Sequence, residues 1–316
     1  MSHILLADIG GTNIRFALYR NGKMGPITVF KTADFKSAEQ AFDNYINTLH
    51  HKPTHMILGA AGPIHNHVVH LTNLNWSLHA KKFEKRYLLK ECHLVNDFVL
   101  KGYGVLSLTK KDYITLNDAK TQKNSPICII GPGTGLGVCF LTCHNGSWQS
   151  HASEAGHTDI SACSNQGQKI LTILKRNKIN ISAEEILSGR GLTALYCAVS
   201  HLNGQEANLS TPEEVFEAAL KGDSFAQEAY SHFFDFLATF AGNMGITLKT
   251  LGGIFITSSI LKHDFIVDML RQHDFRTPFK NRGKMENLAS NIPVFLITRP
   301  KLAFLGLKTL AQHIEK

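Results

Sequence analysis

An Asn-Asp pair follows an apolar run in the first third of the chain, where Leu94 and Val95 lead into Asn96 and Asp97. Asn and Asp are common in turns at strand ends, so an ordinary turn would explain the pair. A carboxylate at the end of a buried strand can also accept the proton of a hydroxyl group, and a neighbouring amide can bind other hydroxyls. The pair is therefore a candidate for acid–base chemistry on a hydroxylated substrate.

A glycine-rich segment near the N-terminus, Asp8-Ile9-Gly10-Gly11-Thr12, follows another apolar run. The two glycines allow a tight turn whose N–H groups can reach phosphate oxygens, and the Thr12 hydroxyl adds a donor. Asp8 would repel a phosphate directly, but it fits if Mg²⁺ lies between the two, bound directly or through water. The alternative is a plain hairpin turn.

A second glycine-rich segment, Gly131–Gly137, lies about 120 residues further along the chain. It lacks the Lys of a Walker loop, and Val138 stands where a dinucleotide fingerprint would need its third glycine. What remains is a strand–turn–strand loop able to bind phosphate. Two such loops, each after an apolar strand, indicate a nucleotide more strongly than either does alone.

Alternating strands and helices would position these segments. Asn21-Gly22 predicts a hairpin between the first strands, and capping residues predict helix starts at Ser37 and Thr211. A phenylalanine-rich helix is expected from about Ser224 to Leu248, and this interleaving argues for an α/β fold. The expected strands include His3–Asp8, Ile14–Tyr19, His55–Gly59, His93–Val95, Ile127–Ile130, Val138–Thr142, Gly253–Thr257 and Val294–Ile297.

Composition narrows the class of protein. The 316 residues are 43% hydrophobic and 18% charged, as expected for a globular chain of about two domains. Six cysteines without a CxxC pair fit a reducing cytoplasm, and we find neither a signal peptide nor an apolar run of the ~20 residues that span a membrane. The net charge of +8 comes from scattered lysines, so we expect no nucleic-acid partner.

The two glycine loops together resemble those of the bacterial glucokinases, in the hexokinase–actin–heat-shock-chaperone superfamily. The matching motifs are Asp-x-Gly-Gly-Thr-Asn from Asp8 and Gly-x-Gly-Thr-Gly-Leu-Gly from Gly131, and the resemblance runs along nearly the whole chain. It implies a two-domain actin-like ATPase (hexokinase-type) fold with a central cleft that holds ATP. We expect a small α/β domain of residues 1–107 plus 298–316 and a large α/β domain of residues 108–297.

The resemblance also implies a sugar site. In the family, the Asp that matches Asp97 takes the proton of the sugar 6-hydroxyl, and the matching Asn bonds the ring. Two further family motifs are present, a Glu-x-Gly-His and a Ser-Ala-Glu whose Glu closes over the sugar; the following Glu185 is at a capping-box position. The expected sugar-binding residues are Asn96, Asp97, Gly135, Glu154, His157 and Glu184.

ATP and Mg²⁺ are the cofactors that the resemblance implies. The match is weaker after the strand that meets the adenosine in this family, where Ser258 and Ser259 replace a glycine pair. Their side chains could either crowd the nucleotide or form hydrogen bonds to it. Arg190 stands where relatives often have Pro. The expected nucleotide-binding residues are Asp8, Ile9, Gly10, Gly11, Thr12, Gly133, Thr134, Gly253 and Ser258, with Asp8 also as the Mg²⁺ ligand.

Zinc is not expected. A related repressor–kinase group carries a cysteine zinc site after its Glu-x-Gly-His, but here only Cys163 is present, and His65, His67 and His70 lack partners at ligand spacing. The favoured hypothesis is a cytoplasmic ATP-dependent glucokinase, whose partners are glucose and ATP without a membrane, and which forms a homodimer as relatives commonly do. The alternatives are a kinase for another hexose, such as mannose or glucosamine, and a catalytically weak sugar sensor.

Overall fold

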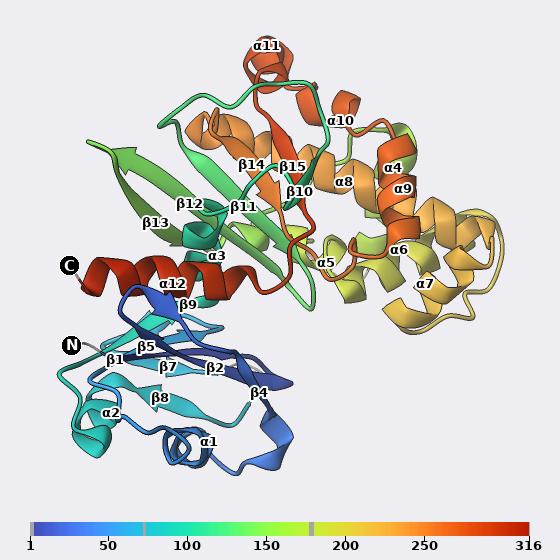
Figure 1. The fold of residues 1–316 in the computed structure, drawn as a ribbon. Coiled ribbons are helices and arrows are strands. Elements are labelled where there is room, and N and C mark those ends of the chain that lie inside the picture. Colours follow the sequence, from blue (N-terminus) through green and yellow to red (C-terminus); the bar gives the residue numbers. More distant parts are fainter. Residues whose placement is uncertain (1–2, 72–73, 177–179, 316) are drawn as a thin grey trace. The chain divides into compact units, whose positions relative to one another are not determined.

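The computed structural model describes residues 3–71, 74–176 and 180–315, and the chain divides into two compact units. Unit 1 comprises Met1–Leu108 and Arg299–Lys316, and unit 2 comprises Thr109–Thr298. Each unit combines a sheet with helices (Figure 1), which is the predicted α/β class. Within the described ranges, no helix is both long enough and apolar enough to cross a membrane.

The sheet of unit 1 runs in the order β3-β2-β1-β5-β9, with β4 also paired to β2, and a small sheet β6-β7-β8 accompanies it. Strands β1, β5 and β9 are parallel, and β2 returns antiparallel to β1. The strands are β1 His3–Ile9, β2 Asn13–Arg20, β3 Lys23–Met24, β4 Thr28–Lys31, β5 His55–Ala60, β6 Ile64–His65, β7 Val68–His70, β8 Ser77–His79 and β9 Glu91–Asn96.

Both faces of this sheet are packed, as the nearly continuous apolar sequence of β1 predicts. Leu5 and Ala7 belong to one buried cluster, whereas Ile4 and Leu6 belong to another that also contains Leu100. The helical segments of unit 1 are η1 Thr32–Asp34, α1 Ala38–Ile46, α2 Ala80–Tyr87, α3 Asp97–Val105 and α12 Leu302–Ile314.

Helices α3 and α12 approach each other through glycines. A Cβ atom on Gly306 would lie 1.9 Å from the carbonyl oxygen of Leu100, and one on Gly104 would lie 2.4 Å from that of Leu302. No side chain fits at either position, so the two helix backbones pack directly together. Figure 1 shows α12, in red, as the last helix of the chain. The closing helix therefore fixes the helix that begins at Asp97.

Unit 2 has a sheet in the order β10-β15-β14-β11-β12-β13, and most of its helices gather on one side, together with the largely buried α8 (Figure 1). Its strands are β10 Tyr113–Thr115, β11 Ile127–Pro132, β12 Leu136–His144, β13 Ser147–Ser153, β14 Gly253–Ile256 and β15 Val294–Ile297. Its helical segments are η2 Ala155–His157, α4 Asn165–Lys175, α5 Ala183–Ile186, α6 Gly189–Leu202, α7 Pro212–Leu220, α8 Ser224–Leu248, α9 Asp264–Gln272, α10 Arg276–Lys280, η3 Gly283–Met285 and α11 Glu286–Ser290.

Most predicted elements are confirmed. The Asn21-Gly22 hairpin has positive φ at both residues, Ser37 caps α1, and Thr211 begins α7 with a capping box. The alternative of an ordinary turn at Asn96-Asp97 is wrong, because Asn96 ends β9 and caps the nine-residue helix α3, which begins at Asp97.

Candidate functional site

The first glycine loop joins β1 to β2 as a tight hairpin. Asp8 is opposite Arg15 in the antiparallel register, and the Gly10 N–H donates to the carbonyl of Asn13 at 3.0 Å. Thr32 donates from its hydroxyl to the Gly10 carbonyl at 3.1 Å, which holds the turn from the side. Gly11 and Thr12 are exposed, whereas the side chain of Ile9 is buried in the core. Ile9 can therefore offer a ligand only its backbone.

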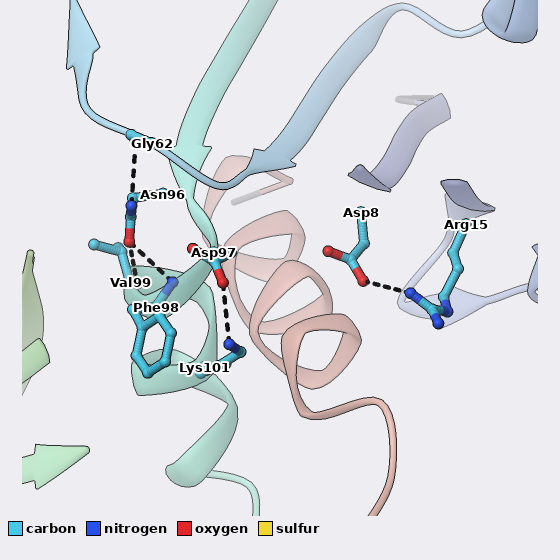
Figure 2. Close-up of polar contacts among 8 residues, drawn as sticks. All are labelled: Asp8, Arg15, Gly62, Asn96, Asp97, Phe98, Val99 and Lys101. Carbon is cyan, nitrogen blue, oxygen red and sulfur yellow. Dashed lines mark hydrogen bonds and ion pairs between the residues drawn. The ribbon is translucent and has the colours of Figure 1, made fainter. Parts of the chain in front are cut away.

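Asp8 occupies a partly enclosed position at the end of β1. Its Oδ2 atom lies 3.4 Å from Nη1 of Arg15 (Figure 2). Burial raises the pKa of the Asp8 carboxyl, and the charge of Asp97 adds to that rise, while Arg15 and Lys101 oppose it. A cation at this place would relieve the same penalty, because opposite charge favours the ionised carboxyl.

The strand register brings Asp8 and Asp97 to one corner of the unit 1 sheet. Asp8 is paired with Gly59 of β5, and Gly59 is paired with Val95 of β9, two residues before Asp97. A Cβ atom on Gly59 would lie 2.4 Å from Cδ1 of Leu100, so this glycine lets α3 approach the sheet. Figure 2 shows both carboxylates at this corner.

Asn96 is the N-cap of α3. Its Oδ1 atom accepts hydrogen bonds from the N–H groups of Phe98 and Val99 at 2.9 and 3.3 Å, and its amide nitrogen donates to the Gly62 carbonyl at 3.3 Å (Figure 2). An amide nitrogen has two hydrogens, so one donor remains for a substrate. The cap also explains why the helix begins at Asp97.

Asp97 is the first residue of α3, where a helix favours negative charge. Its Oδ2 atom lies 3.0 Å from Nζ of Lys101, one turn along the helix. About a quarter of each side chain is exposed, so the pair is accessible from solvent. The sequence analysis identified Asp97 but missed Lys101, although the i,i+4 spacing of the two residues was visible.

The second glycine loop, in unit 2, has the same construction as the first. It joins β11 to β12 antiparallel, with Pro132 opposite Leu136, so the predicted strand–turn–strand form is confirmed. The Gly133 N–H donates to the Gly135 carbonyl at 2.8 Å, and the Gly133 carbonyl accepts from the N–H of Gly189 at the start of α6. The loop is therefore held by its own backbone and by a neighbouring helix.

Leu136, just after this loop, connects the glycine loop to both motifs expected to bind sugar. Its N–H donates to Oε2 of Glu184 at 2.9 Å. Its carbonyl oxygen would lie 2.1 Å from a Cβ atom on Gly156, so only glycine allows the turn that carries Glu154 and His157 to pack there.

The side chains of Glu154, His157 and Glu184 differ in their exposure to solvent. Glu154 and His157 are 76% and 60% exposed and lie 3.9 Å apart, whereas Glu184 is 23% exposed. Oε1 of Glu184 lies 3.8 Å from Nη2 of Arg190. Glu185 accepts from the Ser182 N–H at 3.0 Å, which completes the predicted capping box.

A pocket of about 530 Å³ lies in unit 2 beside Gly133 and Thr134. Its apolar and aromatic walls suit a flat ring. The remaining lining residues, most of which the sequence analysis missed because only tertiary packing joins them, are Gly189, Arg190, Leu192, Pro212, Glu213, Phe216, Tyr230, Ser259, Ile260, Lys262 and His263.

Two residues expected at the nucleotide, Gly253 and Ser258, are not among the residues that line this pocket. Gly253 begins β14 opposite Ile127, so it lies at the end of the strand remote from the glycine loop; its φ of +122° and its contact with Phe295 explain the glycine. Ser258 donates to the Pro132 carbonyl at 2.7 Å and accepts from the N–H groups of two following residues. Its neighbour Ser259 lines the pocket instead.

Comparison with known proteins gives a consistent result. The model of the family described as Glucokinase matches residues 5–314. A glucokinase of Photorhabdus laumondii is 32% identical over 305 residues, covering 96% of this chain and 94% of its own.

Solved structures are similar along the same length. A glucokinase from an Antarctic psychrotroph superposes with a TM-score of 0.90 at 30% identity, covering 99% of both chains. A Streptomyces griseus ROK family glucokinase, solved with glucose and AMPPNP, superposes at 0.64 with 17% identity over 99% of this chain and 100% of its own. These similarities confirm the predicted actin-like ATPase fold, and the chain belongs to the glucokinase family.

Proposed function

We propose that this protein transfers the γ-phosphoryl group of ATP to the 6-hydroxyl group of glucose and releases glucose 6-phosphate and ADP. The observation that carries the proposal is the position of Asp97. Its carboxylate begins α3 at the carboxyl end of β9, in the same corner of the sheet as Asp8 and its glycine hairpin. Membership of the glucokinase family supports the same reaction.

Asp97 acts as the base in this proposal. Its carboxylate accepts the proton of the 6-hydroxyl while the hydroxyl oxygen forms a bond to the γ-phosphorus. The bond from that phosphorus to the β–γ bridging oxygen breaks, and ADP leaves with the electron pair. Because the transition state of phosphoryl transfer is loose, the protein contributes mainly by positioning groups and balancing charge.

The remaining polar residues bind the sugar. Glu154 and His157 are exposed and adjacent, and a carboxylate with an imidazole can both accept from and donate to hydroxyl groups. Glu184 adds a second carboxylate next to the glycine loop, and Asn96 offers its remaining amide hydrogen. Gly135 belongs to this sugar-binding group because a Cβ atom there would lie 2.5 Å from Oε2 of Glu184.

The pocket in unit 2 fits the adenosine of ATP. Phe216 and Ile260 supply apolar walls, and Gly133 and Thr134 provide the backbone and hydroxyl donors that phosphates need. In unit 1, Gly10, Gly11 and Thr12 form the matching hairpin. Gly253 is not part of this proposed nucleotide site, and Ser259 replaces Ser258 in it.

Mg²⁺ would be held by Asp8. The carboxylate is a hard oxygen ligand whose ionised form is disfavoured by burial, so a cation suits it. The described ranges contain no group of three His, Cys, Asp or Glu side chains able to hold a metal, which fits an ion that keeps several waters and is bound largely through phosphates. Bound there, Mg²⁺ would neutralise phosphate charge.

Turnover with a panel of hexoses tests the proposal. We expect ATP-dependent phosphorylation of glucose in preference to mannose and glucosamine, and a fall in kcat of about 10²- to 10⁴-fold in Asp97→Ala with glucose affinity largely kept. Asp34→Ala, an exposed carboxylate of the same unit, is the control. Glucose binding without turnover on any hexose would favour the sugar-sensor alternative.

We further propose a cytoplasmic homodimer, which light scattering after gel filtration would test.

A further inference from the structure

The proposed mechanism gives no task to Lys101, which lies at the unit 1 corner beside Asp97. Its Nζ atom lies 3.0 Å from Oδ2 of Asp97 and 3.7 Å from the ring centroid of Phe98 (Figure 2). Both partners come from the first turn of α3, so the ammonium group is held by a carboxylate and by the face of an aromatic ring.

The pair of Asp97 and Lys101 adds little to stability by itself. An i,i+4 ion pair on a helix contributes only about 0.3–0.5 kcal/mol. The pairing becomes useful if the charge of Lys101 also acts on the second substrate.

The geometry of the corner indicates where that charge acts. Asp8 is paired with Gly59, and Gly59 is paired with Val95, two residues before Asp97, so the ammonium group that pairs with Asp97 lies at the same corner of the sheet as Asp8. Asp8 follows β1 directly into the glycine hairpin proposed to receive phosphate. A flexible lysine side chain with a quarter of its surface exposed can change partners within such a space.

We propose that Lys101 is a catalytic cation, which pairs with Asp97 before the reaction and contacts the transferred phosphoryl group during it. As Asp97 takes the proton of the 6-hydroxyl it loses its charge, and the ammonium group loses its partner. The phosphoryl oxygens carry negative charge at the same moment, so Lys101 moves to them. This inference rests on the proposed function and adds a residue to it.

The test compares Lys101→Met, which removes the charge, with Lys101→Arg, which keeps it. In Lys101→Met we expect kcat to fall by about 10²- to 10³-fold, in the range for loss of one group that stabilises transition-state charge. The affinity for glucose, measured by calorimetry without nucleotide, should change less than about threefold, since the charge does not contact the sugar ring. Lys101→Arg should recover most of the lost rate. Lys85→Met, an exposed lysine on α2, is the matched control.

Binding of glucose 6-phosphate gives a readout that needs no turnover. The affinity for this product should fall at least about tenfold in Lys101→Met and remain near wild type in Lys101→Arg and Lys85→Met, because a charge-assisted contact to phosphate is lost only in the first. Wild-type turnover on glucose decides the proposed function, whereas this comparison decides the role of Lys101. An unchanged affinity for glucose 6-phosphate, or a kcat that stays level or rises in Lys101→Met, would overturn the inference.

Discussion

Replacing Ser258 by Ala should destabilise unit 2 and leave nucleotide binding nearly intact. The Ser258 hydroxyl donates to the Pro132 carbonyl at 2.7 Å and accepts from the N–H groups of Ile260 and Leu261 at 3.0 and 3.2 Å. It thus ties the end of β11, where the glycine loop begins, to the segment after β14. Alanine would leave all three backbone groups without this partner.

The size of the effect follows from these bonds. One neutral hydrogen bond contributes about 1 kcal/mol, and a hydroxyl that caps backbone N–H groups contributes about 1 kcal/mol more. The free energy of unfolding of unit 2 should therefore fall by about 2 kcal/mol, which corresponds to roughly 4–8 °C in Tm. The KM for ATP should change by less than about threefold, because the lost bonds lie within the protein.

Ser259→Ala is the matched control, since Ser259 is the serine that lines the pocket. It should raise the KM for ATP by about threefold to tenfold, the range for loss of one hydrogen bond, with Tm unchanged. Thermal unfolding and steady-state kinetics of both variants measure the two quantities. The reasoning fails if Ser258→Ala keeps its Tm and raises the KM for ATP, since that would place Ser258 on the nucleotide.

Four further variants test separate parts of the structure. Glu185→Ala should lower the free energy of unfolding, measured with urea, by about 1 kcal/mol because the capping box is lost. Glu184→Ala should instead weaken glucose binding, measured by calorimetry. Gly306→Ala should cost about 1–3 kcal/mol and lower kcat, because its methyl group would push α3 aside; a more stable variant would contradict this. Asp8→Asn should abolish activity yet raise stability at pH 7. The pKa of Asp8 is raised, so the folded protein holds the proton of this carboxyl more tightly than the unfolded protein does. The free energy of unfolding of the wild type therefore falls as pH rises above 3.8. The extra stability of Asp8→Asn should vanish when urea unfolding is measured below that pH.

The elements that sequence predicted best are those with strong local patterns. Strand β1 and strand β11 are apolar runs that end at glycine, and Thr211 with Pro212 marks a helix start within four residues. Helix α3 was missed because Gly102 and Gly104 lower helix propensity. At Gly104 that loss is offset by packing against α12, a partner far away in the chain.

The candidate site also contains residues that local motifs predicted and residues that only tertiary packing brings together. Motifs with fixed local spacing predicted Asp97, Glu184 and both glycine hairpins. A sequence does not show which end of β14 faces the glycine loop, and the structure places Gly253 at the end remote from it. The walls of the pocket, such as Phe216 and Ile260, come from segments that only tertiary packing joins.

The packing of α12 on α3 also sets an order of events during synthesis. About 200 residues separate the two helices, which at 5–20 residues per second means roughly 10–40 s of translation. Unit 2 is continuous, from Thr109 to Thr298, and can fold on the ribosome in that interval. Throughout it, the face of α3 that carries Leu100 has no helix to cover it. The nascent chain should therefore be a client for chaperones until its last helix emerges, and Asp97 gains its final support only then.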